Sequence, residues 1–172
     1  MYRWFRARGQ AHKDADGRLL RISGLLSDQT ASREADERRR LASTVVENTI
    51  EGVVVTDAYS RILSVNRSFT RLLGFSEEEM LGQTPRMFKS GRHDKAFYDA
   101  MWARMRSHGH WQGEIWNRRK SGEVFPERMS LSAVKDANDH VTHYVCMFTA
   151  ISAEKAREAQ LSRIVEDRTK AL

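Results

Sequence analysis

Two short apolar runs near the middle of the chain predict a β-hairpin. Residues 53–55 are three consecutive valines, and residues 62–65 alternate apolar with polar side chains. Val and Ile favour strands, and two such runs on either side of a short polar turn commonly pair with each other. The pattern therefore predicts two antiparallel strands joined by a turn at residues 58–60.

Apolar residues with helical spacing follow this hairpin directly: Phe69, Leu72 and Leu73. Asn66 is the predicted N-cap of that helix, because its side-chain oxygen can accept a hydrogen bond from a free backbone N–H of the first turn. Gly74 is expected to end the helix. Ser76 is expected to begin a second short helix, which ends at Gly82.

The second half of the chain predicts a longer helix and three strands. The helix begins at about Asp94 and ends at Gly109. Its apolar face consists of four residues: Phe97, Met101, Trp102 and Met105. Strands are expected at residues 111–117, 123–134 and 141–150, with polar turns between them. Two strands, then helices, then three strands define an α+β fold.

Two motifs in this order of elements resemble the PAS domain family of bacterial signalling proteins. The first motif consists of Asn66, residues 74–76, Glu79 and residues 81–82. The second is the segment 111–122, WQGEIWNRRKSG, which is similar to a hairpin of PAS sensors attached to cyclic-di-GMP enzymes. The resemblance covers residues 45–152. It implies a five-stranded antiparallel sheet, with short helices and one longer helix packed on one face.

One departure from the family concerns the hinge to the outgoing helix. PAS domains usually close with an Asp-Ile-Thr-like triplet, whereas residues 150–152 here are Ala-Ile-Ser. The chain therefore lacks, at Ala150, a carboxylate that could accept a charge-assisted hydrogen bond.

The first 30 residues repeat part of the later pattern. The repeated residues share one offset of 122 positions (133 − 11): Ala11, Lys13, Asp14 and Ala15 recur as Ala133, Lys135, Asp136 and Ala137. Residues 2–8 and 19–26 read as strands on either side of a tight turn at residues 14–17. Residues 1–30 are interpreted as the last two strands of a preceding PAS domain. A separate N-terminal hairpin is the alternative.

Two charged helices are expected to flank the domain. Residues 31–44 form a linker helix, and residues 153–172 form an outgoing, coiled-coil-like signalling helix. Each has only a thin apolar stripe: Leu41 and the adjoining Val45 for the first, and Leu161, Ile164 and Leu172 for the second. Isolated helices of this length are marginal in water unless the stripe is covered. We therefore expect a parallel homodimer that pairs these helices.

Composition narrows the function classes. The 172 residues include 29 Lys and Arg against 23 Asp and Glu, a net charge of +6 with the two signs interleaved along much of the chain. Interleaved charge favours a solvated surface over a nucleic-acid site, including at residues 118–120. The single Cys146 fits a reducing cytoplasm. No membrane segment or signal peptide is visible, so we expect a cytoplasmic protein.

No motif for catalysis or metal binding is present, and we expect neither an enzyme nor a metal site. The resemblance implies a sensory module. Such a module transmits a ligand or redox signal through its flanking helices to an output domain outside this chain, either a diguanylate cyclase or phosphodiesterase or a histidine kinase. A ligand-free PAS module for dimerisation and spacing is the alternative, because both functions need the same fold.

The resemblance also implies candidate cofactor residues. Trp111 and Asn117 are similar to residues that line a flavin such as FAD, and His93 lies where haem-binding PAS domains place an iron ligand. Pro85 stands where blue-light PAS domains carry a reactive Cys, which excludes a thiol–flavin adduct. In the alternative, Trp111 and Trp116 cover the sheet and Asn117 faces solvent in a turn. A domain with no bound cofactor is preferred over flavin, and flavin over haem.

Overall fold

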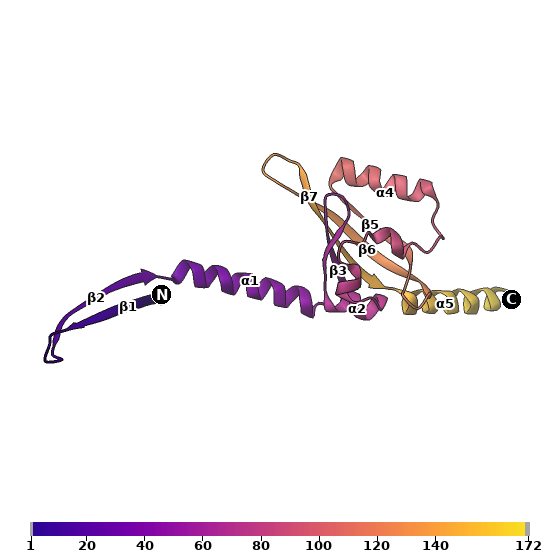
Figure 1. The fold of residues 1–172 in the computed structure, drawn as a ribbon. Coiled ribbons are helices and arrows are strands. Elements are labelled where there is room, and N and C mark those ends of the chain that lie inside the picture. The colour runs from indigo at the N-terminus through magenta and orange to yellow at the C-terminus, as the bar shows by residue number, and fades with distance from the viewer. Residues whose placement is uncertain (1, 171–172) are drawn as a thin grey trace. The chain divides into compact units, whose positions relative to one another are not determined.

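The computed structural model describes residues 2–170, and side chains through Arg163 (Figure 1). The chain forms two units, Met1–Val45 and Val46–Leu172. Ile164 and Leu172, two residues of the predicted seam in the outgoing helix, lie outside the described side chains and residues respectively.

The second unit contains a five-stranded antiparallel sheet with strand order β4-β3-β7-β6-β5. Its strands are β3 (Gly52–Asp57), β4 (Ile62–Val65), β5 (His110–Arg118), β6 (Val124–Lys135) and β7 (Val141–Ala150). Its helices are α2 (Arg67–Leu73), α3 (Glu77–Met80), the 3-10 helix η1 (Pro85–Phe88), α4 (Lys95–His108) and α5 (Ser152–Lys170). The predicted α+β fold is confirmed. The 3-10 helix η1 was not predicted, and α3 ends at Met80, two residues before the predicted Gly82.

Capping side chains set where these helices begin. The Asp94 side chain accepts from the backbone N–H of Phe97 at the start of α4. Ser76 and Glu79 form a reciprocal capping box at α3. Gly74 and Gly109 take left-handed backbone conformations at the ends of α2 and α4. The predicted start and end of α4 are therefore confirmed.

Asn66 holds the first part of this unit together. Its Oδ1 accepts from the backbone N–H groups of Val53 and Phe69, and its Nδ2 donates to the carbonyl oxygens of Val46 and Glu51, each at 2.9 Å. Only 2% of Asn66 is exposed. These four bonds use both acceptor sites and both donors of the amide, so its burial costs little.

The hydrophobic core lies between one face of the sheet and the helices. Strand alternation places Phe125, Met129 and Leu131 of β6 on that face, beside Phe148 of β7. On α4, Met101 and Met105 are buried, whereas Phe97 and Trp102 of its predicted apolar face are partly buried. The longer helix therefore packs on one face of the sheet, as predicted.

The first unit has the geometry of the β6–β7 hairpin. It contains β1 (Phe5–Lys13), β2 (Leu19–Asp28) and most of α1 (Thr30–Asn48). The strand predicted at residues 2–8 thus begins at Phe5 and continues to Lys13, and the helix predicted at residues 31–44 is longer at both ends. The bounds of β2 and α1 recur 122 positions later as those of β7 and α5 (141 − 19; 152 − 30).

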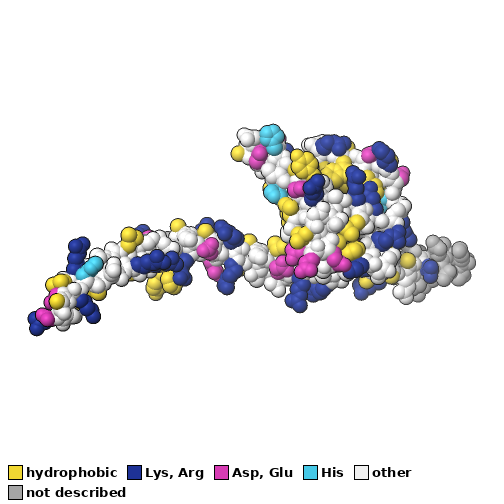
Figure 2. All heavy atoms as spheres, viewed as in Figure 1, with side chains coloured by type: hydrophobic (Ala, Val, Ile, Leu, Met, Phe, Trp, Pro, Cys, Tyr) yellow, Lys and Arg dark blue, Asp and Glu magenta, His cyan; other side chains and the backbone are white. Residues whose placement is uncertain are grey.

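Details of pairing recur with the same offset of 122 residues. Ala7 pairs with Leu26, and Met129 pairs with Phe148. At the hinge to the helix, the backbone N–H of Gln29 donates to Trp4 O (2.7 Å), and that of Ile151 donates to Pro126 O (3.0 Å). In the first unit the matching strand face is apolar and exposed, with Ile22 and Leu26 each 67% accessible. Figure 2 shows apolar side chains on the surface of this hairpin.

Two glycines of the β5–β6 hairpin occupy positions that are unfavourable for a larger residue. A Cβ at Gly113 would lie 2.6 Å from Cζ2 of Trp111, and Gly122 has φ +88. We expect Gly113→Ala to lower the free energy of unfolding by about 1–3 kcal/mol through overpacking. Gly122→Ala should lower it by about 1–2 kcal/mol through backbone strain. Urea unfolding followed by fluorescence measures both changes.

The matched control is Gly9→Ala, where the nearest atom to an added Cβ is 3.7 Å away and φ is not positive. That variant should unfold like the native protein. A Gly113→Ala protein as stable as the native one would show that Trp111 does not restrict this position.

Candidate functional site

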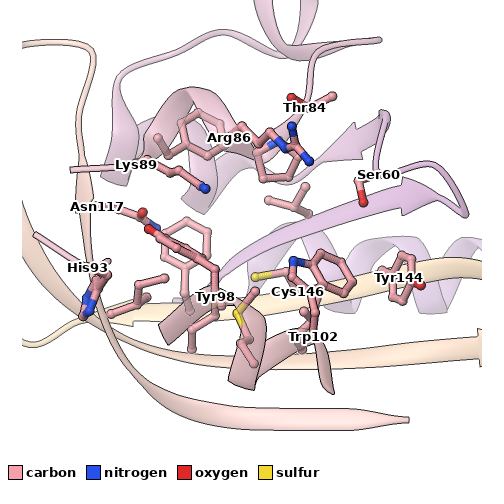
Figure 3. Close-up of a pocket in the computed structure, with 18 of the residues that line it drawn as sticks. Ser60, Thr84, Arg86, Lys89, His93, Tyr98, Trp102, Asn117, Tyr144 and Cys146 are labelled. Atoms are coloured by element: carbon pink, nitrogen blue, oxygen red, sulfur yellow. The ribbon is translucent and has the colours of Figure 1, made fainter. Parts of the chain in front are cut away.

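A cavity of about 850 Å³ lies between the inner face of the sheet and the helices. Elements far apart in the sequence contribute to it: Phe69 from α2, Tyr98 and Trp102 from α4, Asn117 from β5 and Cys146 from β7. Figure 3 shows Tyr98, Trp102 and Asn117 extending into one space, with Arg86 and Lys89 at its edge. Most of the remaining wall is apolar, which is typical of a small-molecule site.

Glu127 is the buried ionisable group of this cavity. It lies on the inner face of β6, opposite Ile115 of β5 and Ala150 of β7, and is 2% exposed. Asn117 Nδ2 donates to Glu127 Oε1 at 2.7 Å, whereas Oε2 has no hydrogen-bond partner within residues 2–170. Burial raises the pKa of Glu127 to about 7, despite the opposing hydrogen bond from Asn117 and the charge of Arg119.

Tyr98 brings a second polar group to the same end of the cavity. Figure 3 shows its hydroxyl pointing toward Asn117. The hydroxyl is buried and has no hydrogen-bond partner in the described part of the chain. Burial raises the pKa of Tyr98, so the group stays protonated near neutral pH. The Nζ atom of Lys89 lies over the Tyr98 ring, 3.8 Å from its centroid.

His93 lines the cavity, but one of its nitrogens is already bonded. The backbone N–H of Trp116 donates to His93 Nε2 at 2.9 Å, and the imidazole stacks on Phe97 with centroids 3.9 Å apart. Burial lowers the pKa of His93, although Asp94 opposes that change. An imidazole that accepts at Nε2 is neutral, and iron ligation at that atom requires loss of the Trp116 bond. The haem hypothesis stays a prediction.

The two candidate flavin residues lie apart. Asn117 lines the cavity, whereas Trp111 lies against Gly113 and meets the ring of Phe97 edge-on. Six residues along one strand separate them by about 20 Å. The alternative prediction, that Trp111 and Trp116 cover one face of the sheet and Asn117 faces solvent in a turn, is wrong. Trp111 and Trp116 are five residues apart on β5 and so face opposite sides of the sheet. Asn117 lies in β5 and bonds Glu127 rather than facing solvent in a turn.

Glu127 was missed from the sequence, although a signal for it exists. Positions 125, 127, 129 and 131 of β6 share one face and read Phe, Glu, Met and Leu. A lone carboxyl in an apolar face is unusual, since buried Glu is rare unless paired. Alternation alone does not reveal which face of β6 is the buried one.

Charged side chains hold the start of α5 to the sheet. Arg128 pairs with Glu154 (3.0 Å), and Lys155 pairs with Glu114 (2.7 Å). In the first unit the corresponding hinge uses Asp28, which accepts from the backbone N–H of Thr30 at 2.9 Å. The matching residue in the second unit is Ala150. The missing carboxylate is therefore accompanied here by a set of ion pairs between β5, β6 and α5.

Comparison with known proteins identifies the class of this domain. The PAS domain family matches residues 50–153, and the chain belongs to that family. Over 118 residues it is 28% identical to a nitrogen fixation regulatory protein of Klebsiella oxytoca, covering 69% of this chain and 24% of that protein. A blue-light-activated histidine kinase of Brucella canis is 26% identical over 121 residues, covering 69% and 25%. The chain thus spans about a quarter of the length of these relatives.

A crystal structure of a PAS domain from Colwellia psychrerythraea superposes with a TM-score of 0.63. That match has 19% sequence identity and covers 67% of this chain and 98% of the other, so it supports the fold alone. No helix in residues 2–170 has both the length and the apolar character needed to cross a membrane. Within the described residues, no three His, Cys, Asp or Glu side chains are arranged to hold a metal ion.

The raised pKa of Glu127 predicts a pH-dependent stability. Between the ordinary carboxyl value of 4.5 and about 7, the folded protein keeps a proton that the unfolded chain has released. The contribution of Glu127 to the free energy of unfolding is therefore greatest below pH 4.5. It falls as the pH rises to 7, by about 3 kcal/mol in total. We expect Glu127→Gln to abolish this loss, measured by urea unfolding at pH 5 and pH 8.

The control is Glu78→Gln, which changes an exposed carboxyl in α3. It should leave the difference between pH 5 and pH 8 as in the native protein. Equal pH dependence in the native protein and in Glu127→Gln would show that Glu127 is ionised near its ordinary pKa.

Proposed function

We propose that this PAS domain is a non-catalytic sensory module, which transmits a ligand or redox signal from its cavity to an output domain through α5. One observation carries the proposal. Adjacent residues of β6 serve the cavity and the outgoing helix: Glu127 lines the cavity, and Arg128 pairs with Glu154 of α5.

Backbone contacts reinforce this link. The N–H of Ile151, at the start of α5, donates to Pro126 O, one residue before Glu127. Ile151 is 1% exposed, so the hinge is packed into the domain. A change in charge or occupancy at Glu127 therefore acts on a strand that is directly bonded to the helix. Such a short path suits a two-state shift of the helix.

The relatives support the proposed context. A regulatory protein and a histidine kinase contain related segments within longer chains, so we propose a cytoplasmic kinase or cyclic-di-GMP enzyme as the output partner. We further propose that residues 1–30 are the end of a preceding PAS domain, with α1 as the connecting helix. The common offset of 122 residues in bounds, register and hinge bonds supports this division.

A ligand-free spacer is the second candidate function. The cavity of about 850 Å³, with a buried carboxyl in its wall, favours the sensor over a fully packed core. Flavin and haem remain predictions. The absorption spectrum of the purified protein, before and after addition of each cofactor, tests them.

Transmission can be tested with the charge of Glu127 as an internal signal. The pKa of this carboxyl is lowered by the hydrogen bond from Asn117 and by the charge of Arg119, and the carboxyl in turn raises the pKa of Cys146. Between pH 6 and pH 8 the carboxyl ionises, and we expect hydrogen exchange in the first turn of α5, where Lys155 N–H donates to Ile151 O, to change beyond its intrinsic pH dependence. Glu127→Gln should remove the extra change. An identical response in both proteins contradicts transmission.

A parallel homodimer is the proposed assembly. Leu41 and Val45 of α1 are each 62% exposed, and Leu161 of α5 is 63% exposed. Pairing the same stripes across a two-fold axis would cover them. We expect concentration-dependent dimers in sedimentation velocity, and at least about tenfold weaker association in Leu41→Glu/Leu161→Glu, since two apolar contacts become repulsive charges. Glu37→Gln is the control. A strict monomer at high concentration would contradict the dimer.

A further inference from the structure

One end of the cavity holds polar groups that the protein itself leaves incompletely bonded. Glu127 Oε2 and the Tyr98 hydroxyl are buried, and neither has a hydrogen-bond partner among the described residues. Asn117 bonds the other oxygen of this carboxyl, because its Nδ2 donates to Glu127 Oε1 at 2.7 Å. A buried polar atom without a partner destabilises the protein, and more so when it is charged.

The bonding capacity of each group is specific. An ionised carboxylate only accepts, so Glu127 Oε2 requires a donor. A protonated tyrosine hydroxyl can donate, and Asn117, whose Nδ2 is engaged by Glu127, keeps an amide oxygen that can accept. The site as a whole therefore offers acceptors at Glu127 and Asn117 and a donor at Tyr98. The complementary molecule carries an N–H donor beside a carbonyl acceptor.

The walls of the cavity restrict the rest of that molecule. Trp102, Tyr144, Phe69 and Met101 present aromatic and apolar surface to the cavity. Such surface favours a flat ring over a flexible polar chain. Arg86 and Lys89 at the edge disfavour a cationic ligand, so a neutral ring is preferred over an ammonium or guanidinium group.

We infer that this cavity binds a neutral, planar cyclic amide, whose ring N–H donates to Glu127 and whose adjacent carbonyl accepts from Tyr98. This inference rests on the proposed sensory function and assigns the class of ligand and the two recognition residues. Glu127 and Tyr98 come from β6 and α4, so the ligand bridges the sheet and the long helix.

Quinazoline-2,4-dione serves as the probe, because it is a flat two-ring imide with ring N–H groups beside carbonyls. Its 1,3-dimethyl derivative is the matched control ligand, which keeps the carbonyls and ring but has no N–H donor. Calorimetry at pH 7.5 with the full chain measures both. We expect the imide to bind and the dimethyl compound to bind at least about tenfold more weakly, as loss of one charge-assisted hydrogen bond predicts.

Protein variants test the assigned residues. Glu127→Gln and Tyr98→Phe should each weaken imide binding about tenfold, whereas Glu78→Gln, which changes an exposed carboxyl of α3 outside the cavity, should not. Circular dichroism and a thermal melt verify folding of each variant. Glu127→Gln removes a buried charge and is expected to fold, so one interpretable variant remains if Tyr98→Phe does not.

Three outcomes overturn the inference: no binding of the imide, equal binding of the dimethyl compound, or native affinity in both Glu127→Gln and Tyr98→Phe. Imide binding that depends on Glu127 but leaves exchange in α5 unchanged would support the inference and contradict the proposed sensory function. Exchange in α5 that responds to Glu127 charge without imide binding would do the reverse.

Discussion

The buried amide of Asn66 is the contact on which the front half of the domain depends. Its four hydrogen bonds connect the start of β3, the first turn of α2, and two carbonyls in the segment that follows α1 and in its last turns. No other single side chain type offers two acceptor sites and two donors at this size. An aspartate would lack the donors, and a leucine would leave two N–H groups and two carbonyls buried without partners. Because β3 and α2 supply Val54 and Phe69 to the cavity wall, this corner positions part of that wall.

The inner face of the sheet combines two demands that conflict. Core packing needs apolar side chains at alternate positions of β6, and Phe125, Met129 and Leu131 supply them. Glu127 interrupts that row and is only half satisfied by Asn117. Burial of such a group lowers the stability of the domain, and residues that lower stability without an apparent structural return are expected at functional sites. Two features favour a sensor over a spacer: the loss of stability from burying Glu127, and the neighbouring Arg128, which pairs with the outgoing helix.

The β1–β2 and β6–β7 hairpins share the same backbone features although their side chains differ. Turn, register, hinge hydrogen bond and helix start recur 122 residues apart, with quite different side chains on the strands. What differs is how polar side chains attach the helix that follows each hairpin. After the β1–β2 hairpin, Asp28 accepts from the backbone N–H of Thr30. After the β6–β7 hairpin, ion pairs of Arg128 and Lys155 hold the helix to the sheet. Half-exposed ion pairs contribute little stability each. The backbone bond of Ile151 and the burial of its side chain therefore contribute more to holding this hinge than the ion pairs do.

By itself the sequence determined the local structure and the family. Apolar periodicity, the caps Asn66, Ser76 and Asp94, and the glycines after the helices act within one turn of chain, so α2, α4 and all five strands of the sheet could be predicted to within a few residues. The short η1 was missed, since one turn has no periodicity. The tertiary structure alone decided the site. Only sheet pairing brings Glu127 beside Asn117 and places Tyr98 across from them, because these contacts join residues whose separation in sequence carries no signal.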